Sequence, residues 1–226
     1  MLRRLPLVLL ALLLAAPAWA QLDRITNSEA TSGLRAALER GAQVAVDGLG
    51  RTDGFFGNDK VKILLPESLQ SAERMLRNFG MGKYADELVL TMNRAAEAAV
   101  PEAKKLLVDA VKKMSVQDAK GILTGGETAG TEYFKRTTSD PLRARFLPIV
   151  KKATAKVGLA QKYNEYAEKG ARFGLIDKDA ANIDSYVTQK ALDGLFLMIA
   201  EEEKKIRKDP VGTASNILQK VFGALR

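Results

Sequence analysis

The sequence predicts an all-α protein, a single-domain multi-helix bundle built around a buried helix in its C-terminal half. Apolar residues recur at three- and four-residue steps along most of the chain, the spacing of one helix face. Residues 195–200 (LFLMIA) are apolar on every side of such a helix, so we expect other helices to surround it. No fixed-period repeat or long linker divides residues 21–226, which favours one domain.

The first half of this pattern predicts three helices and one short extended segment. The first helix spans residues 28–49, after which glycines interrupt the periodicity. Apolar and polar residues alternate near residues 59–65, which predicts an extended segment or a short strand. The second helix begins at Pro66, a favoured first helical residue, and runs to about Phe79. The third spans residues 83–100, and its predicted inner face consists of Tyr84, Leu88, Met92, Ala95, Ala96 and Ala99.

The second half of the chain is predicted to hold seven further helices, several of them short. Ser115 and Asp118 are spaced as in a capping box, and the Asp140-Pro141 pair is typical of a helix start. Residues 179–208 form the longest periodic run. The predicted spans are 101–114, 115–123, 127–138, 140–158, 163–169, 179–208 and 216–225.

The first twenty residues predict a secretory signal peptide. Arg3 and Arg4 give a positive start, residues 5–16 are almost wholly apolar, and residues 18–20 (Ala-Trp-Ala) match an A-x-A cleavage site. The apolar run is shorter than the roughly 18 residues that a membrane span needs. Residues 1–20 are therefore left out of the fold, and we expect a Sec-type route to the periplasm.

The sequence is basic, with 35 Lys and Arg against 27 Asp and Glu and a net charge of +8. Removing Arg3 and Arg4 leaves 33 basic residues against 27 acidic ones, a net charge of about +6. The two signs are interspersed, which is typical of a solvated helical surface. A sharper interpretation is attraction to an anionic lipid surface or an envelope polymer. Nucleic acid is not expected as a partner, because aromatic residues for base stacking make up only 6% of the chain.

Cysteine and histidine are absent from the sequence. Their absence excludes a cysteine nucleophile, a Ser-His-acid triad and zinc sites built from Cys and His. Carboxylates, Lys, Tyr, Ser and Thr remain for acid–base or nucleophilic chemistry. We therefore expect no metal site and no cofactor, and we assign no catalytic residue.

Two groups of polar residues on otherwise apolar helices form the candidate site. Asn93, Arg94 and Glu97 lie on an Ala-rich helix, with Arg94 and Glu97 three residues apart. Lys190 and Asp193 precede the apolar centre of the longest helix. One interpretation is a polar lining of a pocket between helices. The other is structural: a local ion pair between Arg94 and Glu97, and a buried Asp193 that pairs with Lys190 or Arg94.

Two further features lie on the same long helix. Gly194 interrupts the helix interior at a cost of about 1 kcal/mol against alanine, which predicts a packing reason for it. Residues 201–203 are three consecutive glutamates, and successive residues on a helix point about 100° apart. These carboxylates are therefore predicted to pair with the lysines at 204 and 205 on a solvated helix end.

Four segments carry a family resemblance: MNRAAEAAVPEAK (92–104), DAKGIL (118–123), FLPIVKKATAKVG (146–158) and YVTQKALDGLFLMIAEEEKKIRKDP (186–210). They resemble a bacterial family catalogued as a domain of unknown function, number four-one-nine-seven. The resemblance covers most of residues 21–226, and its last segment is the most specific. It implies an exported, helical bacterial envelope protein and assigns no activity or ligand to any position.

These observations favour an exported, non-enzymatic envelope protein that binds an amphipathic ligand, such as an anionic lipid, or an envelope partner. One alternative is a periplasmic enzyme that uses carboxylate and lysine chemistry near Arg94, Glu97 and Asp193. Another is a purely structural envelope protein. No membrane span is expected in residues 21–226, and the sequence does not specify an oligomeric state.

The leader generates a direct prediction about processing. Cleavage after Ala20 leaves a protein that begins at Gln21, in free or cyclised form. N-terminal sequencing or intact mass of the protein extracted from the cell envelope should show this end. An envelope form that keeps Met1 would contradict the prediction.

Overall fold

The computed structural model describes residues 27–158, 160–165 and 182–209. Within them the chain forms seven α-helices, one 3₁₀ turn and no strand, which confirms the all-α fold class. The predicted leader and the predicted helix at 216–225 lie outside the described residues. The elements are α1 (Asn27–Leu49), α2 (Glu67–Asn78), α3 (Gly82–Ala99), η2 (Val100–Glu102), α4 (Ala103–Lys113), α5 (Val116–Thr124), α6 (Ala129–Thr154) and α8 (Ile183–Lys208).

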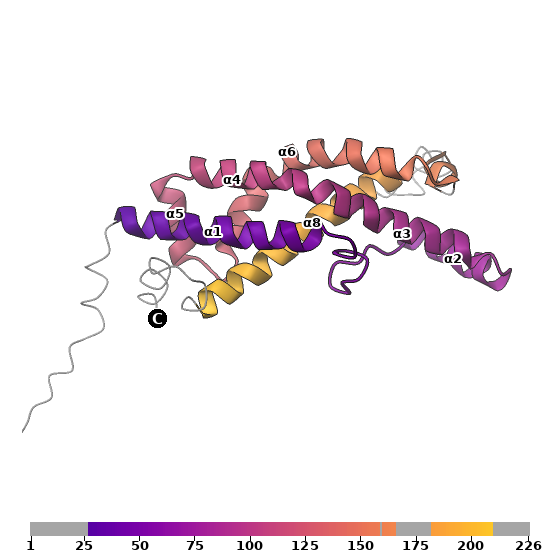
Figure 1. Ribbon diagram of the computed structural model, residues 1–226, viewed down its shortest axis with the longest axis horizontal. Helices are drawn as coiled ribbons and strands as arrows, with labels where there is room; N and C mark the ends of the chain where they lie inside the picture. The colour runs from indigo at the N-terminus through magenta and orange to yellow at the C-terminus, as the bar shows by residue number, and fades with distance from the viewer. Residues whose placement is uncertain (1–26, 159, 166–181, 210–226) are drawn as a thin grey trace, which may run out of the picture.

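Helix α8 is the central helix of the bundle, as the sequence predicts. Figure 1 shows it crossing the molecule obliquely, and α1, α3 and α6 all pack on it. Leu195, Phe196 and Ile199 at its centre are buried. The capping box at the start of α5 is also confirmed, because Ser115 Oγ accepts from the amide of Asp118 and the Asp118 carboxylate accepts from the amide of Ser115.

Helix α6 differs from the prediction of two helices divided at Asp140-Pro141. It is one continuous helix, with Pro141 and Pro148 inside it. Each proline removes one backbone hydrogen bond, and a helix tolerates this best on its outer, water-facing side. Both prolines are exposed, whereas Leu142 and Phe146 on the opposite side are buried. Packing of that buried side therefore overrides the local helix-breaking signal.

Two predictions of buried side chains are wrong in detail. The run at 195–200 is not enclosed on all sides, because Leu197 is 41% exposed and Met198 is half-buried. On α3, Tyr84 is 45% exposed and Ala85 is buried in its place. Tyr84 lies in the first turn of α3, in the α2–α3 hairpin that reaches the end of the molecule (Figure 1).

Glu203 corrects the prediction that residues 201–203 are a solvated helix end. Its carboxylate is buried and accepts the backbone N–H groups of Gly130 and Thr131, at 2.9 and 2.8 Å. Arg207, one turn further along α8, donates to the same carboxylate at 2.9 Å. Glu203 therefore supplies the acceptor for the first turn of α6, which has no side-chain cap of its own. Only Glu202 follows the predicted pattern, with Lys205 at 2.6 Å.

The segment 50–66, which joins α1 to α2, contains turns and extended backbone but no strand. It packs onto α8 at Gly194. A Cβ atom at this glycine would lie 2.7 Å from Phe55 Cε1 and 3.3 Å from Val61 Cβ, and Phe55 is fully buried. Gly194 therefore has the packing reason that the sequence predicts: it lets this segment lie directly against the helix.

No helix among the described residues is both long enough and apolar enough to cross a bilayer.

The contact at Gly194 predicts that two matched glycine-to-alanine substitutions change the stability of the protein in opposite directions. Gly194→Ala should destabilise the protein by about 1–3 kcal/mol, because the new methyl group overpacks the buried Phe55 ring. Gly121→Ala, on an exposed and open side of α5, should instead stabilise it by up to about 1 kcal/mol through helix propensity. Urea denaturation measures both changes. Stabilisation by both substitutions would show that the segment does not pack on Gly194.

Candidate functional site

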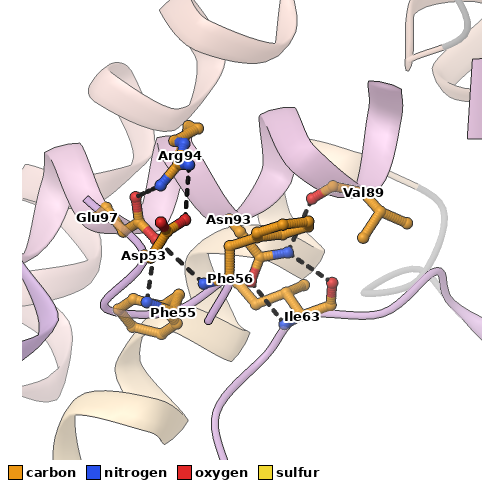
Figure 2. A network of polar contacts seen from close by, with 8 residues as sticks. All are labelled: Asp53, Phe55, Phe56, Ile63, Val89, Asn93, Arg94 and Glu97. Atoms are coloured by element: carbon orange, nitrogen blue, oxygen red, sulfur yellow. Dashed lines mark hydrogen bonds and ion pairs between the residues drawn. The ribbon is translucent and has the colours of Figure 1, made fainter. Parts of the chain in front are cut away.

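The segment 50–66 is attached to α3 by the buried carboxylate of Glu97. Glu97 Oε1 accepts the backbone N–H groups of Phe55 and Phe56, at 3.0 and 3.1 Å. Its Oε2 accepts from Arg94 Nη1 at 2.6 Å, one turn earlier on the same helix. Figure 2 shows all three donors converging on this one side chain. Two amides of an irregular segment thus obtain the partner that helices and sheets normally provide.

Asn93, one turn before Glu97, makes the second attachment. Its side chain accepts from the amide of Ile63 and donates to the carbonyl of Ile63, both at 2.8 Å. It also donates to the carbonyl of Val89, so that both amide hydrogens are used. Asn93 is fully buried, and Ile63 is buried beside it. The segment is therefore fixed to α3 at two points, near each of its ends (Figure 2).

Arg94 closes the outer side of this network. Its guanidinium also reaches Asp53 Oδ1 at 2.7 Å and lies 5.8 Å from the centre of the Phe56 ring. Asp53 has a φ of 63°, an uncommon backbone conformation for a residue other than glycine. The hydrogen bonds that Arg94 donates to Glu97 and then to Asp53 raise the pKa of its guanidinium.

The five candidate residues do not form one cluster. Asn93, Arg94 and Glu97 share the network on α3, whereas Lys190 and Asp193 lie on an outer face of α8. Asp193 is exposed and accepts a hydrogen bond from Gln189 at 2.7 Å, so its predicted burial and pairing with a cation are wrong. The buried face of α8 in this region carries Leu192 and Leu195, and Asp193 lies outside it.

Lys190 and Asp193 line a groove between α8 and the segment 50–66. Tyr186, Lys190, Asp193 and Leu197 are four or three residues apart and form one stripe along α8. Residues 60–66 and the start of α2 form the opposite wall. The space has a volume of about 650 Å³ and is open to solvent. We call it the lysine groove, and its defining residues are Lys60, Lys62, Leu64, Tyr186, Lys190 and Leu197.

The lysine groove combines cations with exposed apolar side chains. Leu64 and Leu197 are 61% and 41% exposed, on opposite walls. Lys62 Nζ lies 4.3 Å from the centre of the Phe56 ring, and Lys190 Nζ lies 5.7 Å from that of Tyr186. The Tyr186 ring lines the groove and so keeps the Lys190 ammonium group there, whereas the Phe56 ring is not one of the lining residues. Two carboxylates, those of Glu67 and Asp193, also line the groove.

Two contacts set the ends of this groove. The Tyr186 hydroxyl donates to the carbonyl of Leu64 at 3.0 Å, and burial raises the pKa of this phenol. Lys60 Nζ lies 2.8 Å from Glu201 Oε2, and this hydrogen bond lowers the pKa of the Glu201 carboxyl.

Beyond Lys60 lies a second groove of about 490 Å³, against α1. Its three carboxylates (Asp53, Asp59 and Glu202) outnumber its two cations (Arg51 and Lys60).

The chemistry available at the two places differs. Every acceptor position that the structure uses on Glu97 faces a backbone amide or Arg94, so this carboxylate holds structure in place. Across residues 27–158, 160–165 and 182–209, no group of three His, Cys, Asp or Glu side chains converges as metal ligands would. The lysine groove, in contrast, presents ammonium groups and apolar walls to solvent, which suits reversible binding.

Sequence reasoning located Lys190 and Asp193 but missed Lys60, Lys62, Leu64 and Tyr186. The alternation at 59–65 was the available signal, because it places charged and apolar side chains on opposite sides of an extended segment. The alternation does not show that this segment lies beside α8. The buried Glu203 was missed for a similar reason, since its partners are backbone amides.

Comparison with known proteins gives a family but no described activity. The model of the family described as "Protein of unknown function (DUF4197)" matches residues 24–223. The chain therefore belongs to this family, which confirms the resemblance carried by its four segments. No curated protein and no solved structure matches the chain.

The network on α3 predicts a large effect for one substitution. Glu97→Ala should destabilise the protein by about 3–5 kcal/mol, because it leaves the amides of Phe55 and Phe56 without an acceptor in a largely buried place. Glu87→Ala, also on α3 but exposed, is the control and should change stability by less than about 0.5 kcal/mol. Equal stability of the two variants in denaturant titrations would rule out a structural role for Glu97.

Proposed function

We propose that this member of the DUF4197 family is an exported cell-envelope protein that binds an amphipathic ligand with an anionic head in the lysine groove. The proposed activity is binding without catalysis. The head group contacts Lys62 and Lys190, and the apolar part of the ligand lies along Leu64 and Leu197. The observation that carries the proposal is the presence of these two kinds of side chain on facing walls of one 650 Å³ groove.

The size and openness of the groove support this choice of ligand class. Pockets for small molecules range from about 300 to 1,000 Å³. An open groove leaves part of a long apolar chain in water, so we expect a short or single acyl chain. The ammonium groups attract an anionic head, while Glu67 and Asp193 oppose a head with high negative charge.

The alternative of a carboxylate- and lysine-based enzyme has less support. It requires Glu97 and Asp193 to act at one place, yet Glu97 lies in the α3 network and Asp193 in the groove stripe. The alternative of a purely structural envelope protein predicts that the groove holds no ligand. The binding experiment below separates this alternative from the proposal.

The periplasmic location is part of the proposal and rests on the sequence. Residues 1–20 have the three parts of a signal peptide, and the chain contains no cysteine that oxidation could affect.

Calorimetric titration with dodecyl phosphate below its micellar concentration tests the groove. We expect saturable binding that is much weaker for dodecyl maltoside, which lacks the negative charge. Lys62→Gln combined with Lys190→Gln should weaken binding about tenfold, because two ammonium groups leave the groove. The matched control combines Lys120→Gln with Lys152→Gln, two exposed lysines on α5 and α6 outside the groove, and keeps the same net charge.

The comparison between the two double variants decides the outcome. If both weaken dodecyl phosphate binding equally, the effect is one of overall charge and the groove is not the site. If the wild-type protein binds neither amphiphile, the proposal is wrong and a structural role is favoured.

A further inference from the structure

We infer that the turn between α2 and α3 is a membrane-docking tip that inserts into the interface of a bilayer containing anionic phospholipid. The tip is defined here as residues 74–85, the last part of α2, the turn and the first part of α3. It is separate from the lysine groove, and the inference does not depend on ligand binding there.

The tip carries four exposed apolar side chains. Phe79 is 73% exposed, Met75 62%, Tyr84 45% and Met81 42%. Met75 and Phe79 lie one turn apart on α2, next to the turn itself. Gly80, with a φ of 71°, reverses the chain so that Met81 follows immediately. Aromatic and methionine side chains gathered at one end of a protein are costly in water and favourable at the boundary between lipid heads and tails.

The position of the tip suits insertion. Figure 1 shows the α2–α3 hairpin reaching the end of the molecule opposite α5. Helix α2 packs on α3, and Figure 1 shows the hairpin extending past the end of α6. Among the described helices, the turn is therefore the part that would reach a lipid interface first at this end.

The charges around the tip complement an anionic surface. Residues 74–85 contain Arg74, Arg77 and Lys83 and no carboxylate. Arg77 is ion-paired with the carboxylates on either side, Glu73 and Asp86, at 2.7 and 2.6 Å, so the positive charge of the tip beyond this network is that of Arg74 and Lys83. Lys83 Nζ lies 5.1 Å from the centre of the Tyr84 ring, which keeps a cation beside an apolar side chain. The net charge, about +6 without Arg3 and Arg4 of the leader, adds long-range attraction to a negative membrane.

The small size of the tip favours a bilayer over a protein partner. A stable protein interface buries about 800 Å² on each side and involves about 20–30 residues. The tip offers four apolar side chains and the charges of Arg74 and Lys83 on one turn. A bilayer needs no matching cavity and takes up such side chains one by one.

Tryptophan fluorescence tests this inference without background, because Trp19 is the only tryptophan and lies in the leader that the processed form lacks. The tip variant is the form that begins at Gln21 with Phe79→Trp, and the control variant is the same form with Val116→Trp. Val116 is 54% exposed at the start of α5, at the other end of the molecule. The probe is a vesicle of two parts phosphatidylcholine to one part phosphatidylglycerol, with brominated acyl chains that quench tryptophan inside the bilayer.

We expect these vesicles to shift the emission of the tip variant to the blue and to quench it, while the control variant is unaffected. Quenching of the tip variant should fall by at least half when Arg74→Glu and Lys83→Glu are added, and also at high salt, since ions screen exposed charges. Lys120→Glu with Lys152→Glu is the matched charge control and should leave the quenching largely unchanged.

Three results would overturn the inference. Unchanged emission of the tip variant at saturating lipid would show that the tip stays in water, and would favour a protein partner for it. Equal quenching of the tip and control variants would show adsorption without a preferred end. Equal loss of quenching with both pairs of charge reversals would leave no role for the cations of the tip. Each result is distinguishable from failure of the groove, because the groove titration uses no vesicles.

Discussion

The first attachment of the segment 50–66 to the bundle depends on one buried carboxylate. Glu97 takes the amide groups of Phe55 and Phe56 out of water and gives both an acceptor, and Arg94 compensates its charge. A buried carboxylate is costly unless it is paired and hydrogen-bonded, and here it is both. With this end of the segment fixed, Phe55 lies against Gly194 and residues 60–66 lie beside α8. One wall of the lysine groove is thus held by two side chains that do not line it, Glu97 at the start of the segment and Asn93 at Ile63.

The same arrangement occurs a second time in the bundle. Glu203 on α8 accepts two consecutive backbone amides, those of Gly130 and Thr131, and pairs with an arginine one turn away. In both cases an acidic residue and an arginine on one helix attach a different part of the chain through its backbone. Because the donors are backbone amides, such an attachment fixes where the attached segment lies and does not depend on which side chains that segment carries. The exposed surfaces, the groove and the tip, can then carry their cations and apolar groups on a fixed frame.

The sequence predicts the helices well, because helical periodicity and caps are local properties. It also predicts the Arg94–Glu97 pair and a packing role for Gly194, since polar residues and glycine stand out on an apolar helix. It does not predict what lies opposite them. The amides bound by Glu97 are 42 and 41 residues away and have no side-chain signature. Asp193 illustrates the same limit, because only packing decides which face of α8 is buried. Pro141 shows the reverse case: it locally favours a helix start, yet packing along α6 keeps the helix continuous through it.

Amide hydrogen exchange measured by NMR tests the central role of Glu97 most directly. If Glu97 holds the segment as described, the amides of Phe55 and Phe56 are protected nearly as strongly as the buried amides of α3 and α8, and they exchange only when the fold opens as a whole. Exchange of these two amides as fast as that of exposed turn residues, in an otherwise protected protein, would contradict the account.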